Sequence, residues 1–103
     1  MTLTQLQYVV AIAETKSMNK AAAALFVSQP ALSGTIKDLE EELQTELFIR
    51  TNKGIVITTE GQEFLSYARQ MVELGNLVEE RFVNKTIAKK KFSVSMQHYS
   101  FAV

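Results

Sequence analysis

The chain has 103 residues, 47% of them hydrophobic, which is enough for one small domain with a packed core and an additional element. Its 11 basic and 11 acidic residues give no net charge, which counts against binding nucleic acid through an overall basic excess. There is no cysteine, so disulfides and thiolate metal sites are excluded, and no apolar run is long enough to span a membrane. We therefore expect a cytoplasmic protein with no membrane partner.

Charge is unevenly distributed along the chain. Arg50 and Lys53 lie just beyond a segment in which acidic residues are concentrated, at Asp38, Glu40, Glu41, Glu42 and Glu46. We expect the acidic segment to form a solvated face. A basic face and an acidic face can coexist in one small domain, so zero net charge does not exclude a nucleic-acid partner.

The spacing of apolar residues predicts two short helices at the start of the chain. The first begins after Thr4, which suits the N-cap position, and runs to about residue 15. The second runs from about residue 19 to residue 26, where alanines allow a neighbouring element to approach closely. Val27 and Ser28 form the turn that follows.

A third helix is predicted from about residue 29 to residue 43. Ser28 suits its N-cap, and Pro30 is tolerated because first-turn amides have no partner within a helix. One face of this helix is an apolar stripe that we expect to be buried, at Leu32, Ile36, Leu39 and Leu43. Another face is polar, with residues four apart at Gln29, Ser33 and Lys37.

Residues 47–58 are rich in β-prone side chains. Residues 47–50 and 55–58 are predicted to be strands, because the sequence Asn52-Lys53-Gly54 between them favours a hairpin turn. The result is a small β-ribbon with two basic residues, Arg50 and Lys53, near its tip.

From residue 59 to about residue 88 the helical pattern returns. Its apolar positions alternate steps of four and three, the spacing of a helix–helix seam, at Phe64, Ala68, Met71, Gly75, Val78 and Phe82. A small domain has little use for so long an amphipathic helix, so we expect a second copy of the chain to occupy the seam in a homodimer. An intramolecular core is the alternative.

Three short helices followed by a β-ribbon describe a winged helix-turn-helix in a mainly α fold, with the helix-turn-helix at about residues 18–37. The third helix of this motif presents its first turn to the DNA major groove, where Gln29 can make a two-point contact with adenine. Ser28 suits a phosphate contact as well as the N-cap. Lys37 and Arg50 are candidate phosphate contacts; the alternatives are a solvated Lys37 and an Arg50–Glu46 ion pair.

The chain resembles the LysR-type transcriptional regulators over its whole length. The most specific part of the resemblance is Ser-Gln-Pro-Ala-Leu-Ser at residues 28–33, followed by Leu-Phe-x-Arg at residues 47–50. Further matching positions are Leu3, Gln5, Leu6, Val10, Ala13, Glu14, Ser17, Ala21, Ala22, Leu25, Ile36, Leu39, Glu40, Leu43, Thr58 and Gly61.

The resemblance implies a DNA-binding domain at residues 1–58 and a linker and dimerisation helix at residues 59–88. Residues 89–103 would be a hinge and the first strand of a truncated effector-binding domain, whose fold resembles the periplasmic binding proteins. The hinge carries a basic run at residues 89–91, for which a second DNA contact is the alternative role. The effector pocket would begin at Gln97, His98, Tyr99 and Ser100, although a lone histidine cannot form a metal site.

The resemblance also implies double-stranded DNA as the partner, with an inverted-repeat operator of the form T-N11-A. We expect the DNA-binding residues to be Ser28, Gln29, Pro30, Ala31, Ser33, Gly34, Lys37, Arg50 and Lys53. Tetramers and RNA polymerase are further candidate assemblies at full length. No cofactor is expected in this chain, and a small-molecule effector is expected for the full-length protein.

Four positions depart from the family pattern. Gly34 and Lys53 replace frequent arginines and bear on the operator sequence, whereas Gln44 and Glu60 replace a frequent glycine and alanine and concern local geometry. A protein–protein interaction module without sequence-specific DNA binding is the alternative function, supported by the zero net charge. An enzyme is not expected, because the chain has no thiol, no histidine pair and no glycine-rich phosphate loop.

Overall fold

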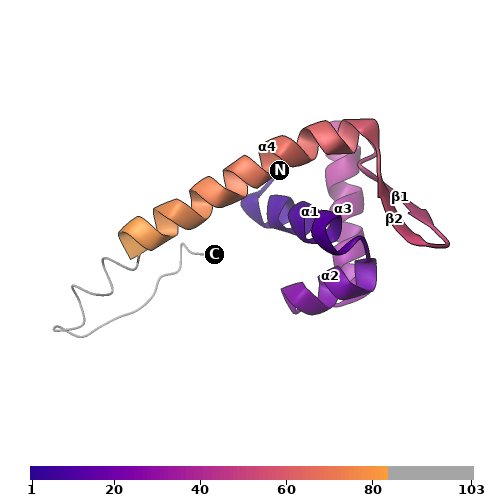
Figure 1. Ribbon diagram of the computed structural model, residues 1–103, viewed down its shortest axis with the longest axis horizontal. Helices are drawn as coiled ribbons and strands as arrows, with labels where there is room; N and C mark the ends of the chain where they lie inside the picture. The colour runs from indigo at the N-terminus through magenta and orange to yellow at the C-terminus, as the bar shows by residue number, and fades with distance from the viewer. Residues whose placement is uncertain (84–103) are drawn as a thin grey trace. The chain divides into compact units, whose positions relative to one another are not determined.

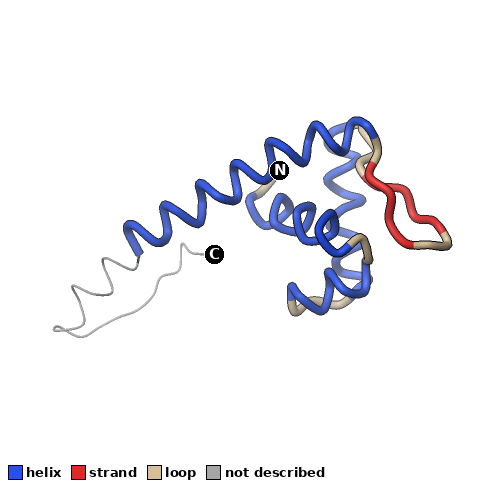
Figure 2. Tube along the Cα trace, viewed as in Figure 1, coloured by secondary structure: helices blue, strands red, loops and turns tan. Residues whose placement is uncertain are grey.

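The computed structural model describes residues 1–83 and confirms a mainly α winged helix-turn-helix with a long final helix (Figures 1 and 2). The elements in chain order are α1 (Leu3–Thr15), α2 (Met18–Leu25), α3 (Gln29–Leu43), β1 (Phe48–Thr51), β2 (Gly54–Ile57), α4 (Thr59–Val78) and the π-helical turn η1 (Glu79–Val83). The chain divides into two compact units, residues 1–72 and a second unit that begins at Glu73.

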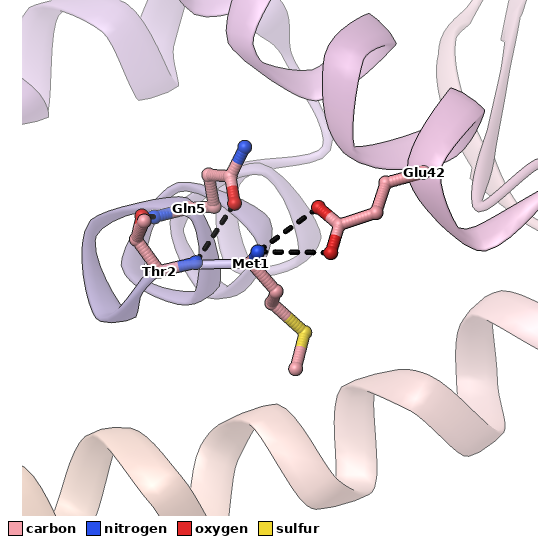
Figure 3. Close-up of polar contacts among 4 residues, drawn as sticks. All are labelled: Met1, Thr2, Gln5 and Glu42. Atoms are coloured by element: carbon pink, nitrogen blue, oxygen red, sulfur yellow. Dashed lines mark hydrogen bonds and ion pairs between the residues drawn. The ribbon is translucent and has the colours of Figure 1, made fainter.

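Helix α1 begins two residues earlier than predicted. Its N-cap is Thr2 rather than Thr4: the Thr2 hydroxyl accepts from the Gln5 amide at 3.1 Å, and Gln5 Oε1 accepts from the Thr2 amide at 2.8 Å (Figure 3). Thr4 is also followed by a glutamine three residues later, so the capping pattern fits both positions. The earlier start prevails because it lengthens the helix and adds the hydrogen bond from the Leu6 amide to the Thr2 carbonyl, 3.1 Å.

The amino group of Met1 ties the start of α1 to the last turn of α3. It lies 2.9 Å from both carboxylate oxygens of Glu42 (Figure 3). Both partners are substantially exposed, so this ion pair contributes little stability.

Each of the first three helices ends in a residue with a left-handed backbone, at Lys16, Phe26 and Gln44. This conformation costs a residue with a side chain roughly 1–2 kcal/mol, which is why glycine is favoured there. At Gln44 the side-chain Nε2 donates to the Glu41 carbonyl at 2.8 Å and offsets part of that cost. The glycine that the resemblance leads us to expect at position 44 would suit this left-handed backbone.

The wing is an antiparallel ribbon whose strands lie within one residue of the predicted ones. Its opposing pairs are Phe48–Ile57, Ile49–Val56, Arg50–Ile55 and Thr51–Gly54. A Cβ at Gly54 would lie 2.9 Å from the Lys16 carbonyl oxygen, and the Ile55 amide donates to that same oxygen at 3.1 Å. Strand β2 is thereby held against the connection between α1 and α2.

The core of the first unit is formed by all three short helices, the wing and the first half of α4. The predicted stripe of α3 is buried except at Leu43, which is only partly buried. The buried cluster consists of Val9, Ile12, Ala13, Ala21, Ala22, Leu32, Ile36, Leu39, Leu47, Ile55 and Leu65.

The wing and α4 meet in a closely packed joint. The Thr58 hydroxyl donates to the Glu46 carbonyl at 2.6 Å and accepts from the Gly61 amide at 2.8 Å. The Thr58 amide donates to the Leu47 carbonyl at 3.0 Å. A Cβ at Gly61 would lie only 2.3 Å from that carbonyl oxygen, so glycine is required at this position.

Residues 84–88 of the predicted long helix, and the expected hinge, strand and effector residues Gln97, His98, Tyr99 and Ser100, lie outside the described residues. Within residues 1–83, no helix is long and apolar enough to cross a membrane. The same residues contain no cluster of His, Cys, Asp and Glu side chains that could hold a metal ion.

Candidate DNA-binding interface

The first turn of α3 carries exposed, small side chains. Ser28, Pro30, Ala31 and Gly34 are exposed, while Gln29 is half-buried. A Cβ built on Gly34 would meet nothing within 4 Å, so the helix surface is open there. This turn can approach a neighbouring surface closely.

The amides of this first turn are mostly occupied. The Ser28 hydroxyl caps the Ala31 amide at 3.2 Å, the Leu32 amide donates to the Ser28 carbonyl at 3.0 Å, and Pro30 has no N–H. Within this turn, the backbone N–H of Gln29 is the one that makes no hydrogen bond to any residue the structure describes. An anion at this helix end would therefore meet one free amide and the helix dipole.

Three of the predicted site residues are joined in one hydrogen-bonded group. Gln29 Nε2 donates to Ser33 Oγ at 3.1 Å, one helical turn away, and Arg50 Nη2 on β1 donates to the same oxygen. Arg50 therefore points toward α3, and the alternative Arg50–Glu46 ion pair is not formed among residues 1–83. The hydrogen bond from Arg50 to Ser33 joins the wing to the polar face of α3, and the sequence of neither segment alone predicts it.

A cleft of about 320 Å³ lies between α3 and the wing. Its lining includes the basic side chains of Lys37 and Arg50, together with Ser33, Glu40 and Phe48. Two cations on facing elements make this cleft suitable for a phosphate group.

Glu40 does not belong to the solvated acidic face in which we placed it from the sequence. Its Oε2 accepts from the amides of Leu47 and Phe48 at 2.7 and 3.2 Å, where the chain enters the wing. The carboxylate is partly buried, and the hydrogen bonds from these two backbone donors offset the cost of removing it from water. Sequence proximity could not show this, since the partners are seven and eight residues away.

Lys53 lies at the tip of the wing and is exposed. Its backbone amide donates to the Thr51 hydroxyl at 3.2 Å, and that hydroxyl donates to the Gly54 carbonyl at 3.0 Å, so the tip is ordered. The Lys53 ammonium forms no ion pair with any residue the structure describes.

Phe26, which lies close in sequence to the first turn of α3, is an exposed aromatic residue that the sequence pattern did not indicate. We predicted it inside the second helix, but it is the left-handed C-cap of α2 and its side chain is 94% exposed. It lies in the turn that leads into α3.

The predicted seam on α4 has two kinds of residue. Ala68 is buried and Phe64 is partly buried against the core, so both face their own domain. Met71 and Val78 are exposed and Gly75 is half-buried, while Phe82, also exposed, lies in η1 rather than α4. The apolar residues exposed along this helix also include Tyr67, Leu74 and Leu77, which the predicted spacing did not contain.

The polar face of α3 is exposed at the first turn of the helix and lies beside a ribbon with basic side chains. This arrangement defines a winged helix-turn-helix DNA-binding protein. The model of the bacterial regulatory helix-turn-helix proteins of the lysR family matches residues 3–62. The chain belongs to this family and contains its helix-turn-helix DNA-binding domain. The members of this family are transcriptional regulators rather than enzymes.

Curated relatives agree with this assignment. The chain is 40% identical over 74 residues to the uncharacterized HTH-type transcriptional regulator YxjO of Bacillus subtilis (strain 168), which covers 72% of the chain and 25% of the relative. It is 41% identical over 81 residues to the HTH-type transcriptional regulator BudR of Klebsiella aerogenes, covering 79% of the chain and 57% of BudR. The chain thus spans only part of the length of these relatives.

Two solved structures of DNA complexes are similar to the chain. The complex of the CbnR DNA-binding domain with DNA matches with a TM-score of 0.75 and 36% identity, covering 84% of this chain and 99% of that one. The complex of the BenM DNA-binding domain with catB site 1 DNA matches with a TM-score of 0.72 and 40% identity, covering 85% and 97%.

Proposed function

We propose that this chain recognises an inverted repeat of the form T-N11-A as a homodimer. The proposal is supported by membership of the LysR family and by the likeness to domains solved in complex with DNA. In a twofold-symmetric dimer the two copies of α3 enter major grooves that lie roughly one helical turn apart, or a multiple of it.

The first turn of α3 is the proposed base-reading surface, and its exposure beside the wing is the observation that carries the proposal. Gln29 and Ser33 read base edges, while Pro30, Ala31 and Gly34 permit close approach. Ser28, Lys37 and Arg50 contact phosphates. Lys53 enters the minor groove from the wing tip, where its ammonium supplies a single point charge instead of the planar guanidinium that an arginine would offer.

The proposed dimer contact is the exposed apolar surface of α4. In the first unit this surface consists of Tyr67 and Met71, which are 60% and 48% exposed. In the second unit the exposed apolar residues of α4 are Leu74, Leu77 and Val78. Large apolar side chains at helical spacing are unfavourable in water and are covered when two such helices pair. Phe64 and Ala68 take a lesser part than we expected, because their own domain covers them.

The remaining functions that we propose concern a longer, full-length protein. We propose a C-terminal effector-binding domain that responds to a small molecule, a cytoplasmic location where the operator DNA lies, and assembly into tetramers with access to RNA polymerase. The relatives support a longer chain, since the matched segment is 25% of YxjO and 57% of BudR.

Fluorescence anisotropy on a T-N11-A duplex and a scrambled duplex, over a salt series, tests the reading of DNA. We expect tighter binding to the repeat at every salt concentration, and loss of this preference in Gln29→Ala. Lys53→Ala should weaken binding to both duplexes. Equal affinity of the unmodified chain for both duplexes, falling steeply with salt, would show that it makes phosphate contacts only.

A further inference from the structure

The Ser33 hydroxyl receives two hydrogen bonds from within the protein. Gln29 Nε2 donates to its oxygen at 3.1 Å, and Arg50 Nη2 donates to the same oxygen from the wing. A hydroxyl group has two acceptor lone pairs and one proton. With both lone pairs occupied, Ser33 is left with its proton and can act toward DNA only as a donor.

The hydrogen bond to Ser33 also determines which groups of the Gln29 side chain remain available to DNA. Its side-chain amide has two N–H donors and one carbonyl oxygen, and Ser33 occupies one N–H. One N–H and Oε1 are left, and these are the two groups that a glutamine uses to contact N7 and N6 of adenine. Before DNA arrives, the reading surface of α3 therefore has a fixed set of hydrogen-bonding groups: a donor at Ser33, and one donor and one acceptor at Gln29.

We propose that Arg50 is a positioning residue for sequence recognition, which holds the Ser33 hydroxyl as a donor beside an adenine-reading Gln29. The inference rests on the proposed function, since it assumes that α3 reads bases. It also predicts which type of base atom Ser33 contacts. The base atom that Ser33 contacts is an acceptor, such as purine N7, guanine O6 or thymine O4, and not the amino group of adenine or cytosine.

The surroundings of Arg50 support this positioning role in addition to its proposed phosphate contact. Arg50 lies opposite the buried Ile55 in the ribbon and lines the cleft that also contains Ser33 and Lys37. Its guanidinium donates to Ser33 across this cleft, whereas Lys37 lines the cleft without an ion pair among the described residues. Lys37 is thus a natural control, because it offers the same charge in the same cleft and, among the described residues, makes no hydrogen bond or ion pair with the reading residues.

The test uses the 103-residue chain and a pool of duplexes randomised within the T-N11-A frame. Bound duplexes are sequenced to give the base preference at each position, and anisotropy gives the overall affinity and its salt dependence. The variants are Ser33→Ala, Arg50→Met, Lys37→Met and the double variant of Ser33→Ala with Arg50→Met. Both methionine substitutions remove one positive charge and keep an unbranched stem, and thermal melting shows whether each variant is folded.

We expect Arg50→Met to lower base preference about tenfold at the same positions as Ser33→Ala, and the double variant to lose no more than Ser33→Ala alone. Lys37→Met should lower affinity evenly on all duplexes and reduce the salt slope by about one phosphate contact. If Arg50→Met behaves like Lys37→Met and keeps the preference at the Ser33 positions, the positioning role is refuted. A preference for an amino group at those positions would refute the donor assignment. If the unmodified chain shows no base preference, the proposed function fails and this inference fails with it.

Discussion

Glu40 Oε2 accepts a hydrogen bond from the Leu47 backbone amide at 2.7 Å and thereby joins α3 to the start of the wing. The same oxygen accepts from the Phe48 amide at 3.2 Å. Two partly buried backbone donors thus depend on one carboxylate for their hydrogen bonds. This contact and that between Arg50 and Ser33 both help to fix the orientation of the wing relative to α3, the helix that we propose reads DNA.

Glu40→Ala should therefore destabilise the domain. It leaves two backbone amides without an acceptor, and we expect the free energy of unfolding to fall by about 2–4 kcal/mol. Glu40→Gln keeps one neutral acceptor and should lose less. Chemical denaturation followed by circular dichroism measures both. Glu41→Ala is the matched control, because that side chain is exposed on the same helix, and it should change stability by less than about 0.5 kcal/mol. Equal effects of the two alanine variants would contradict the bridging role.

Gly34→Ala should stabilise the domain. The new methyl group meets nothing within 4 Å, and alanine is favoured over glycine in a helix by about 1 kcal/mol. For a domain of this size that corresponds to a rise in melting temperature of roughly 4–8 °C. Differential scanning calorimetry checks the shift, and an unchanged or lower melting temperature would show that Gly34 has a structural role in the folded chain.

Gly61→Ala should have the opposite effect, although the substitution is the same and the position is also helical. Its Cβ would lie 2.3 Å from the Leu47 carbonyl oxygen, so backbone must move. We expect a loss of about 1–3 kcal/mol or more, as for other overpacked sites. The same calorimetric series compares the two glycines directly, and a neutral Gly61→Ala would mean that the joint between the wing and α4 yields easily.

Met71→Lys should weaken the proposed dimer without unfolding the domain. Met71 is 48% exposed, so a charge there costs the single chain little but is unfavourable in an apolar interface. Sedimentation velocity should show a shift toward the monomer at a concentration where the unmodified chain is dimeric. Glu73→Lys, at an exposed position about half a turn away, is the control and should leave the dimer intact. Dissociation in both variants would point to repulsion between like charges rather than to an apolar contact at Met71.

Local patterns in the sequence predicted each helix and strand of the first unit, although not every boundary. Ser28 caps α3 as predicted, and the strands around Asn52-Lys53-Gly54 lie within one residue of the expected ones. Capping and turn formation depend on residues a few positions apart, which a sequence displays directly. The start of α1 was wrong because Thr2 and Thr4 satisfy the same local pattern, and only an additional hydrogen bond separates them.

The candidate site required contacts that the sequence does not display. Arg50 and Ser33 are 17 residues apart, and no spacing rule relates a strand to a preceding helix. The face of α4 on which Ala68 lies was assigned to a partner because its spacing fits a seam. A seam with another chain and a face packed on the chain's own core have the same periodicity, so the pattern alone could not distinguish them.

The joint at Thr58 has a mechanical consequence. The Thr58 amide donates to the Leu47 carbonyl, and Gly61 lies so close to that carbonyl that no side chain fits between them. The Thr58 hydroxyl donates to the carbonyl of Glu46. A torque applied to the first turns of α4 would therefore be delivered to the root of the wing instead of being dissipated in a loose connection. A rotation of the first turns of α4 is therefore expected to shift the ribbon as well, through the backbone at Leu47.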